Sequence, residues 1–439
     1  MQTEAEAFLQ RIRAYPDDDT PRLIFADWLD EQDCGRGERL GPEWNGERAR
    51  FIRIQIALAR LTKESIENDH GDSPESNYQG QRDELLAAEQ ALLSTYETEW
   101  TAPFRGLATG LEFRRGFVEV AKVAARQFLR FSHELFATGP IRHLHMLDLG
   151  GSLTSTFQSH FLARLSSLTI HAQHLGEPLT RAVADCRYLS ELKSLRLSRN
   201  RLEDAAVDYL AGSSFLNNLE ELDLSENDLG ETAGRSLAAS PCLSRLKQLE
   251  LGGNRLGPAG VVAITSSDRL TSLTRLGLAG NEIGSPRLYT LAEPHALLRV
   301  PEIDLSANDL NASYLRVIFA APSETDSPPR VRELDLSHNN IGDEGARVIA
   351  ASPSLKGLRV LRLVGCGIGD RGTCYLAESP HLAELRELYL ENNPITDAGL
   401  RHLITSPNLG NLRHLGMPRL GISVTIQRLL VNRLLRRRK

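Results

Sequence analysis

The feature that most limits how this chain can fold is a repeat that fills its C-terminal three quarters. The hexapeptide Leu-Asp-Leu-Ser-His-Asn at residues 334–339 recurs in related forms, and its last residue defines a column. Successive column residues are 27 positions apart, except for one step of 31 between Asn308 and Asn339. The well-formed members of this column are Asn200, Asn227, Asn254, Asn281, Asn308, Asn339, Cys366 and Asn393, and degenerate copies end at Ser152, Gln173 and Leu420. This period is typical of a solenoid and argues against two or three ordinary globular domains.

Each unit reads as a strand, a turn, a helix and a return. The paired leucines around each central residue have the period of two that is typical of a strand, so both face one side and the central residue faces the other. A glycine turn follows the column residue, often with an aspartate that can cap a helix, as at Asp343, Asp370 and Asp397. A Ser-Pro pair then ends several helices, as at Ser352-Pro353, because the residue before proline disfavours helical geometry.

This strand-plus-helix pattern, over residues 144–420, resembles the leucine-rich repeat of the ribonuclease-inhibitor-like type. The resemblance implies an α/β fold, a horseshoe-shaped solenoid with a parallel sheet on its concave face and helices on its convex face. The geometry agrees, because strands stack about 4.8 Å apart whereas helix axes need roughly 8–10 Å. Two units break the pattern, one with Ser285-Pro286 where a helix should start and one with an insertion near residues 321–330.

The column residue has a structural explanation. A buried asparagine can satisfy backbone groups at the turn, and Cys366 stands in the same column, where the leucine-rich pattern accepts it. Cys374 is the cysteine that we expect to be exposed, and no base is placed beside it to make it a nucleophile. Packing and turn satisfaction thus explain Leu334, Leu336 and Asn339, which leaves Asp335 as the position where specificity should be sought.

Residues 1–62 read as a small all-helical domain. Asp19 or Thr20 is expected to cap a second helix that has Pro21 in its first turn, and the triple aspartate at 17–19 is read as capping and solvation, not as a calcium loop. The segment from Asp19 to Glu31, with its Ala-Asp-Trp-Leu core, resembles the repeat-companion domain found at the N-terminus of many planctomycete repeat proteins. That family has no assigned chemistry, and the long Cys34–Gly46 insertion departs from its pattern.

The remaining boundaries follow composition and pattern. We expect a flexible linker at 63–82, a helical and hairpin cap of the solenoid at 83–145 with its turn at Arg114–Gly116, and leucine-rich repeats at 146–420. A capping helix and a basic tail form residues 421–439, and the tail from Arg428 carries six bases and no acid.

Charge and cysteine content limit the cellular compartment and the class of partner that we expect. The net charge is −6, aromatic residues make up only 6% of the chain, and the five cysteines follow no disulfide framework. With neither a signal-peptide pattern nor a long apolar run, we expect a cytoplasmic protein without a membrane span. The chain is also not basic enough to predict non-specific nucleic-acid binding.

The candidate site is the concave face of the predicted sheet. From Glu221 to Asp335 its two outward columns hold seven acids and one base. Towards the C-terminus the face is less charged and includes one aromatic side chain, which is typical of a contact anchor. The candidate partner-binding residues are Glu221, Asp223, Glu250, Arg275, Glu302, Asp304, Glu333, Asp335, Arg362, Glu387 and Tyr389. A solvated acidic sheet that serves only solubility is the alternative reading.

The sequence carries no P-loop, no GxSxG, no HExxH and no clustered metal ligands, so we expect no enzyme activity, cofactor, metal or small-molecule substrate. The sequence instead favours a protein–protein interaction scaffold whose concave face binds a partner with a basic surface. Such a scaffold could act as a regulator or as an inhibitor. Such a protein would act as a monomer or within a hetero-complex. The competing hypothesis is a nucleic-acid- or enzyme-associated module that uses residues 1–62 or the basic tail for targeting.

Overall fold

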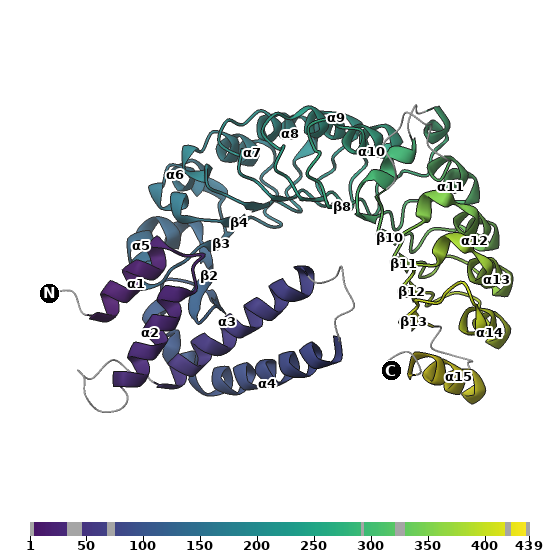
Figure 1. The fold of residues 1–439 in the computed structure, drawn as a ribbon. Coiled ribbons are helices and arrows are strands. Elements are labelled where there is room, and N and C mark those ends of the chain that lie inside the picture. The colour runs from purple at the N-terminus through teal and green to yellow at the C-terminus, as the bar shows by residue number, and fades with distance from the viewer. Residues whose placement is uncertain are drawn as a thin grey trace. The chain divides into compact units, whose positions relative to one another are not determined.

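A computed structural model describes residues 4–32, 46–67, 75–290, 294–320, 330–417 and 423–435. The chain divides into two compact units, residues 1–170 and 171–439, which are considered separately below (Figure 1). Most of the Cys34–Gly46 insertion, the insertion at 321–329 and the end of the basic tail at 436–439 lie outside the described residues.

Unit 1 begins with helices and continues with strands. Its helices are α1 (Glu4–Ala14), α2 (Thr20–Glu31), α3 (Gly46–Glu67), α4 (Glu75–Trp100), α5 (Ala125–Thr138) and α6 (Leu153–Phe157), with short 3₁₀ helices at Ala102–Phe104, Gly150–Ser152 and His160–Arg164. Its strands are β1 (Gly110–Arg114), β2 (Phe117–Ala124), β3 (His143–Leu147) and β4 (Ser167–Thr169). β1 and β2 form the predicted antiparallel hairpin, and β2, β3 and β4 pair in parallel.

Two local expectations in unit 1 differ from the structure. α3 continues to Glu67 and α4 starts at Glu75, so helix occupies both ends of the segment expected to be a flexible linker. At the start of α2 the Asp19 side chain makes no capping bond, and the Asp18 carboxylate instead accepts the N–H of Thr20 at 2.8 Å. An adjacent aspartate thus performs the capping that we assigned to Asp19 or Thr20.

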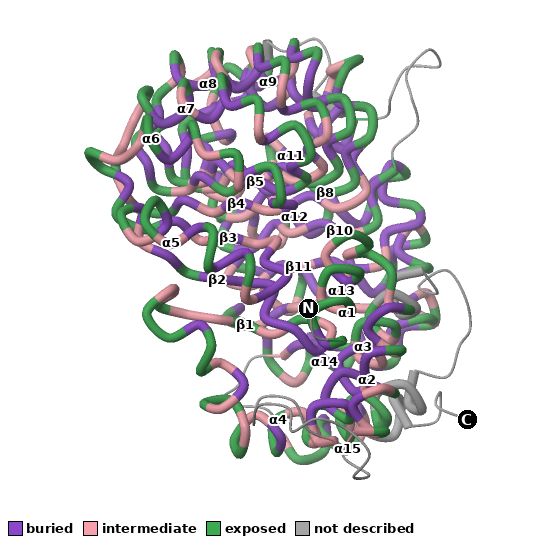
Figure 2. Tube along the Cα trace, turned by 90° about the vertical axis from the view of Figure 1, so that its left-hand side faces the viewer, coloured by how far each residue is buried: buried purple, intermediate pink, exposed green. Residues whose placement is uncertain are grey.

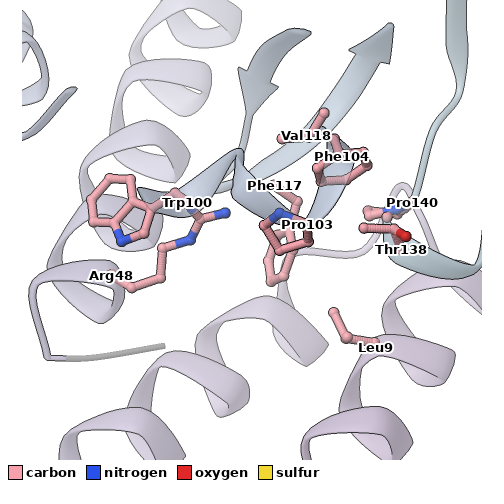
Figure 3. A pocket seen from close by; sticks show the side chains of 10 residues that line it. Leu9, Arg48, Trp100, Pro103, Phe104, Phe117, Val118, Thr138 and Pro140 are labelled. Atoms are coloured by element: carbon pink, nitrogen blue, oxygen red, sulfur yellow. The ribbon is translucent and has the colours of Figure 1, made fainter. Parts of the chain in front are cut away.

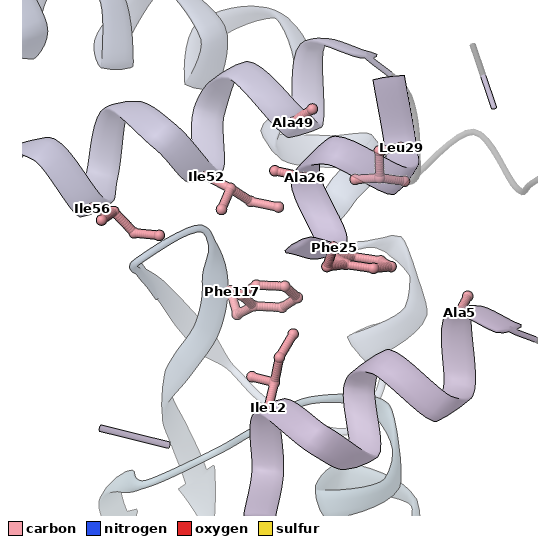
Figure 4. Close-up of a cluster of buried hydrophobic side chains, with 9 residues drawn as sticks. All are labelled: Ala5, Ile12, Phe25, Ala26, Leu29, Ala49, Ile52, Ile56 and Phe117. Carbon is pink, nitrogen blue, oxygen red and sulfur yellow. The ribbon is translucent and has the colours of Figure 1, made fainter. Parts of the chain in front are cut away.

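The N-terminal helices share their core with the hairpin. Figure 4 shows Ile12 of α1, Phe25 of α2 and Ile52 of α3 gathered around Phe117, which comes from β2. Phe117 is only 2% exposed, and its ring lies 5.8 Å from that of Phe25. The all-helical domain expected at 1–62 is therefore completed by a side chain that we had placed in a separate cap at 83–145.

A buried ion pair also joins these helices to the hairpin. Arg22 of α2 donates to Glu119 of β2 at 2.5 Å, and their side chains are 0% and 1% exposed. Next to this pair, the side-chain oxygen of Gln55 in α3 accepts the N–H of Gly116 at 2.6 Å. Removing one partner of such a pair would leave an uncompensated buried charge.

Unit 2 repeats strand and helix along its length, with the strands on the inner side of an arc and the helices on its outer side (Figure 1). Its strands are β5 (Ser194–Arg196), β6 (Glu221–Asp223), β7 (Gln248–Glu250), β8 (Arg275–Gly277), β9 (Glu302–Asp304), β10 (Glu333–Asp335), β11 (Val360–Arg362), β12 (Glu387–Tyr389) and β13 (His414–Gly416). Its helices are α7 (Glu177–Ala184), α8 (Glu203–Ala211), α9 (Glu231–Ala239), α10 (Gly257–Thr265), α11 (Ala312–Ile318), α12 (Gly342–Ala351), α13 (Asp370–Glu378), α14 (Asp397–Thr405) and α15 (Val424–Leu435). Short 3₁₀ helices lie at Arg187–Leu189, Pro286–Thr290, Pro294–Arg299, Pro353–Leu355 and Pro380–Leu382.

The asparagine column satisfies backbone groups, as expected, and in doing so it also links neighbouring units. Asn308 is fully buried, and its side-chain oxygen accepts the backbone N–H of Asn281 at 2.7 Å and of Ile283 at 3.4 Å. Its amide nitrogen donates to the carbonyls of Leu278 at 2.8 Å and Ser306 at 3.0 Å. One side chain therefore satisfies backbone groups of two units.

Cys366 takes the same place and is also buried. Its Sγ donates to the Leu336 carbonyl at 3.2 Å, and burial raises the pKa of the thiol to about 11. The structural role predicted for Cys366 is confirmed.

The helix-start aspartates act across units, not within their own helices. Asp343 accepts the N–H of Gly369 at 2.7 Å and of Gly372 at 2.9 Å, both in the next unit. Asp370 likewise accepts from Thr396 at 2.8 Å and Gly399 at 3.1 Å. Each of these two aspartates therefore caps the helix start of the next unit, because that helix start lies within reach of its carboxylate.

The serines of the Ser-Pro pairs also bridge units. Ser240, Ser352, Ser379 and Ser406 have the extended backbone that we expected before proline. In addition their hydroxyls donate to carbonyls of the preceding unit, as Ser240 does to Ala211 at 2.8 Å and Ser379 to Ala350 at 2.6 Å. Buried and exposed stretches alternate along the trace of unit 2 (Figure 2).

Candidate functional site

The two predicted columns lie side by side on one face of the unit 2 sheet. Neighbouring strands pair in parallel with no slip, as in Glu302–Glu333, Ile303–Leu334 and Asp304–Asp335. The first column contains Ser194, Glu221, Gln248, Arg275, Glu302, Glu333, Val360, Glu387 and His414. The second contains Arg196, Asp223, Glu250, Gly277, Asp304, Asp335, Arg362, Tyr389 and Gly416. The structure therefore brings all the candidate partner-binding residues onto a single face.

The part of this face on β6 to β10 is called the acidic face below. It consists of Glu221, Asp223, Glu250, Arg275, Glu302, Asp304, Glu333 and Asp335. The central strand residues are buried whereas the acids on either side are partly exposed. On β9 and β10 four carboxylates stand on two neighbouring strands, about 4.8 Å apart by the usual strand spacing.

Arginines neutralise the glutamates of the acidic face in part, which the count of acids alone did not predict. Arg275 lies 3.0 Å from Glu250 and 3.8 Å from Glu302. Arg362, one strand beyond the face, lies 3.5 Å from Glu333. Arg196, one strand before it, lies 3.7 Å from Glu221.

Glu250 is held against a glycine of the next strand. A Cβ added to Gly277 would lie 1.7 Å from its carboxylate, so the glycine leaves the space that this side chain occupies. Burial raises the pKa of Glu250, the hydrogen bond from Arg275 opposes that shift, and the nearby charges of Asp223 and Asp304 add to it. Glu250 is thus a member of an internal ion pair and offers little to a partner.

The aspartates of the acidic face also serve the turn that follows each strand. The Oδ1 atoms of Asp304 and Asp335 each accept the N–H of the serine two residues later, Ser306 and Ser337, at 2.8 Å. Asp223 does the same with Ser225 at 2.9 Å. This corrects the division drawn from the sequence, in which Asp335 had no part in the fold. No described basic side chain forms an ion pair with these three aspartates.

The C-terminal end of the face carries a stack of flat side chains. The guanidinium of Arg362 lies 5.2 Å from the ring centre of Tyr389, whose ring lies 4.8 Å from that of His414. The Tyr389 hydroxyl donates to Glu387 at 2.7 Å. Burial, followed by this hydrogen bond and the charge of Glu387, raises the pKa of Tyr389 to about 12. Tyr389 is therefore a neutral and well-positioned aromatic surface.

Cavities are a poor alternative to this face. A cavity of about 30 Å³ in unit 1 is lined by Arg48, Trp100 and Phe104 among others (Figure 3), and it has space for little more than a water molecule. An open hollow of about 540 Å³ in unit 2 is lined by acids and bases such as Glu231, Arg255 and Arg287. Among the described residues, no three His, Cys, Asp or Glu side chains gather as metal ligands would.

The cysteine expected to be exposed is Cys374. Cys374 is partly exposed, as expected, and burial together with the neighbouring Glu378 raises the pKa of its thiol, which disfavours the reactive thiolate.

None of the helices in the described parts of the chain is both long enough and apolar enough to cross a bilayer.

Comparison with known proteins agrees with the repeat. Residues 215–238, 244–264, 329–350 and 381–403 match the family model of the leucine-rich repeat. No curated protein matches the chain. Among solved structures, an internalin from Listeria monocytogenes is similar, with 16% identity, coverage of 71% of this chain and 84% of that one, and a TM-score of 0.40. Leucine-rich-repeat proteins generally serve as scaffolds for protein interaction, through the extended surfaces that stacked repeats create. Four stretches of unit 2 thus match leucine-rich repeats, and its alternating strands and helices have the fold of a leucine-rich-repeat solenoid.

Proposed function

We propose that this protein is a non-enzymatic scaffold that binds a protein partner with a basic surface through the acidic face. The observation that carries the proposal is the group of four carboxylates on β9 and β10, Glu302, Asp304, Glu333 and Asp335. Like charges directly opposite on neighbouring strands are unfavourable, so packing does not account for this group. A lysine- or arginine-rich surface would relieve the repulsion and would be steered towards it over a Debye length.

The C-terminal part of the face would supply the apolar component of the contact. Tyr and Arg are enriched among residues that dominate binding energy, and the Arg362–Tyr389 stack is held in place by Glu387. We propose that the partner lies across β6 to β12. Binding there would regulate or inhibit the partner, depending on which part of the partner's surface is covered.

The repeat subtype, the cellular compartment and a bacterial origin are part of the same proposal. Helices of seven to ten residues on the outer side of unit 2 support the ribonuclease-inhibitor-like type. A reducing compartment, the cytoplasm, is supported by the free thiols of Cys186, Cys242, Cys366 and Cys374. The resemblance of residues 1–62 to a repeat-companion domain supports a bacterial protein in which that region accompanies the repeats.

The test uses a fluorescent octalysine peptide as a stand-in for the basic surface. Glu302→Gln, Asp304→Asn, Glu333→Gln and Asp335→Asn remove four charges together, and the asparagines keep an oxygen for the serine N–H groups. We expect the affinity for octalysine at low salt to fall about tenfold, since exposed charge pairs are worth roughly 0.2–1 kcal/mol each.

A matched control removes four exposed charges elsewhere in unit 2, at Glu191, Glu203, Asp208 and Asp268. The control has the same net charge as the variant, so a general electrostatic effect would lower both affinities equally. Equal affinities of the two variants would contradict a binding role for the acidic face.

A further inference from the structure

A second charged surface lies directly beside the acidic face. The residue that precedes the first column of each strand forms its own ladder, and its last four members are Arg332, Arg359, Arg386 and Arg413. Each is bonded to the one before it, because the N–H groups of Arg359, Arg386 and Arg413 donate to the preceding arginine carbonyl at 2.8, 2.8 and 2.7 Å. We call these four residues the arginine column.

The first half of the same ladder is different in character. It contains Lys193, Glu220, Lys247, Thr274 and Pro301. There a base and an acid alternate, and Lys247 pairs with Glu220 at 2.6 Å. The change from alternating residue types to an unbroken arginine series takes place at β10, where the acidic face ends.

The unbroken series places four like charges close together. Strands lie about 4.8 Å apart, so four successive guanidinium groups start from backbone positions that span only about 14 Å. Like charges at neighbouring ladder positions destabilise a sheet. Arg332 donates to the carbonyl of Gly357 at 2.9 Å, and a Cβ added to that glycine would lie near both the Arg332 guanidinium and the Glu384 carboxylate. All four arginines are partly or fully exposed, with Arg332 and Arg413 the most exposed.

We propose that the arginine column is a second docking surface, which receives an acidic segment of a protein partner. Arginine binds carboxylates through two parallel hydrogen bonds, and a row of them suits an extended segment with regularly spaced acids. This inference deepens the proposed function and rests on it in one respect, because a single partner would present bases to the acidic face and acids to the arginine column. Such a partner would be held in one orientation only.

A protein fits the surroundings of the column better than a nucleic acid does. Glu333, Glu384 and Glu387 lie beside it, and the whole chain has a net charge of −6. A nucleic acid carries a charge on every unit and would meet these carboxylates, whereas a polypeptide can place its acids opposite the arginines alone.

The experiment uses a fluorescent octaglutamate peptide with the full chain. Substituting all four arginines of the column by glutamine should lower the affinity for octaglutamate at low salt by at least about tenfold, which corresponds to about 1.4 kcal/mol. The control replaces Arg126, Arg201, Arg269 and Arg401, which are exposed at other places, by glutamine and should bind octaglutamate as the unchanged chain does. Circular dichroism of both variants establishes that they are folded.

Three outcomes would overturn the proposal. Equal losses in the column and control variants would show a general charge effect, and no loss in either would show that the column does not bind acids. Tighter binding of a thymidine oligonucleotide than of octaglutamate, abolished by the same four substitutions, would assign the column to nucleic acid. Octalysine measured on the same proteins reports the acidic face separately, so failure there would refute the proposed function and leave the result for the column standing.

Discussion

Replacing Asn308 by alanine should be among the most damaging single substitutions in unit 2. The side chain is fully buried and makes four hydrogen bonds, two as an acceptor from Asn281 and Ile283 and two as a donor to Leu278 and Ser306. Alanine keeps none of them and leaves four backbone groups without this partner. At a net value of about 1 kcal/mol for a good bond and less for the long one to Ile283, the loss is about 3–4 kcal/mol.

The measurement is urea unfolding of the full chain, combined with amide hydrogen exchange. Stability in a repeat array is roughly a sum of unit and neighbour terms, so the damage should be local. We expect faster exchange of the Asn281 and Ile283 amides, and little change around Asn393, three units further on. Exchange also reports the effect when unfolding of the array is not two-state.

The matched control is Asn340→Ala, which removes an exposed asparagine next to the column residue Asn339. Its effect should stay within about 0.5 kcal/mol. If Asn308→Ala is no more destabilising than this control, the column asparagines do not satisfy the backbone as the geometry indicates.

Three other changes test the same reasoning. Cys366→Asn should stabilise the chain by about 1 kcal/mol in urea unfolding, because an amide oxygen supplies an acceptor that the thiol lacks; a destabilised variant would contradict this. Glu119→Gln should cost roughly 3–5 kcal/mol by leaving Arg22 as an uncompensated buried charge, whereas leucine at both positions should cost far less, and equal losses would refute this. Burial opposes the charge of Asp370, but hydrogen bonds led by those of Thr396 hold the pKa of this carboxyl below its ordinary value. Its contribution is therefore complete at neutral pH and is lost as the pH falls below about 4, and Asp370→Asn should remove that part of the acid sensitivity of unfolding.

The sequence was sufficient for the strands and their register because the signal is local and repeated. The paired leucines around Asp335 and the column residue Asn339 recur at one spacing, so any register other than the observed one would misalign every unit. The same periodicity placed Ser285-Pro286 as a break in the pattern, and 3₁₀ helices stand there in place of an α-helix. Repeated local chemistry thus determined most of unit 2.

What could not be predicted depends on contacts between segments distant in sequence. Asp343 lies in the first turn of its own helix, and nothing in the neighbouring sequence shows that its carboxylate accepts the N–H of Gly369 in the next unit. Phe117 reads as a strand residue, and only the fold brings it to Phe25. The ion pairs of Arg275 likewise depend on side-chain directions that strand alternation does not specify.

The aspartates of the acidic face have a structural role in the turn, and this role must be separated from any role of their charge in binding. Asp304 and Asp335 accept serine N–H groups, which gives both aspartates a role in the turn. The turn does not require a carboxylate, however, since the same column contains Gly277 and Arg362 in units that keep the strand pairing. An asparagine would also accept the bond without a charge. The negative charge is therefore the property that the fold leaves unexplained, and the substitution of these aspartates by asparagine separates it from the turn.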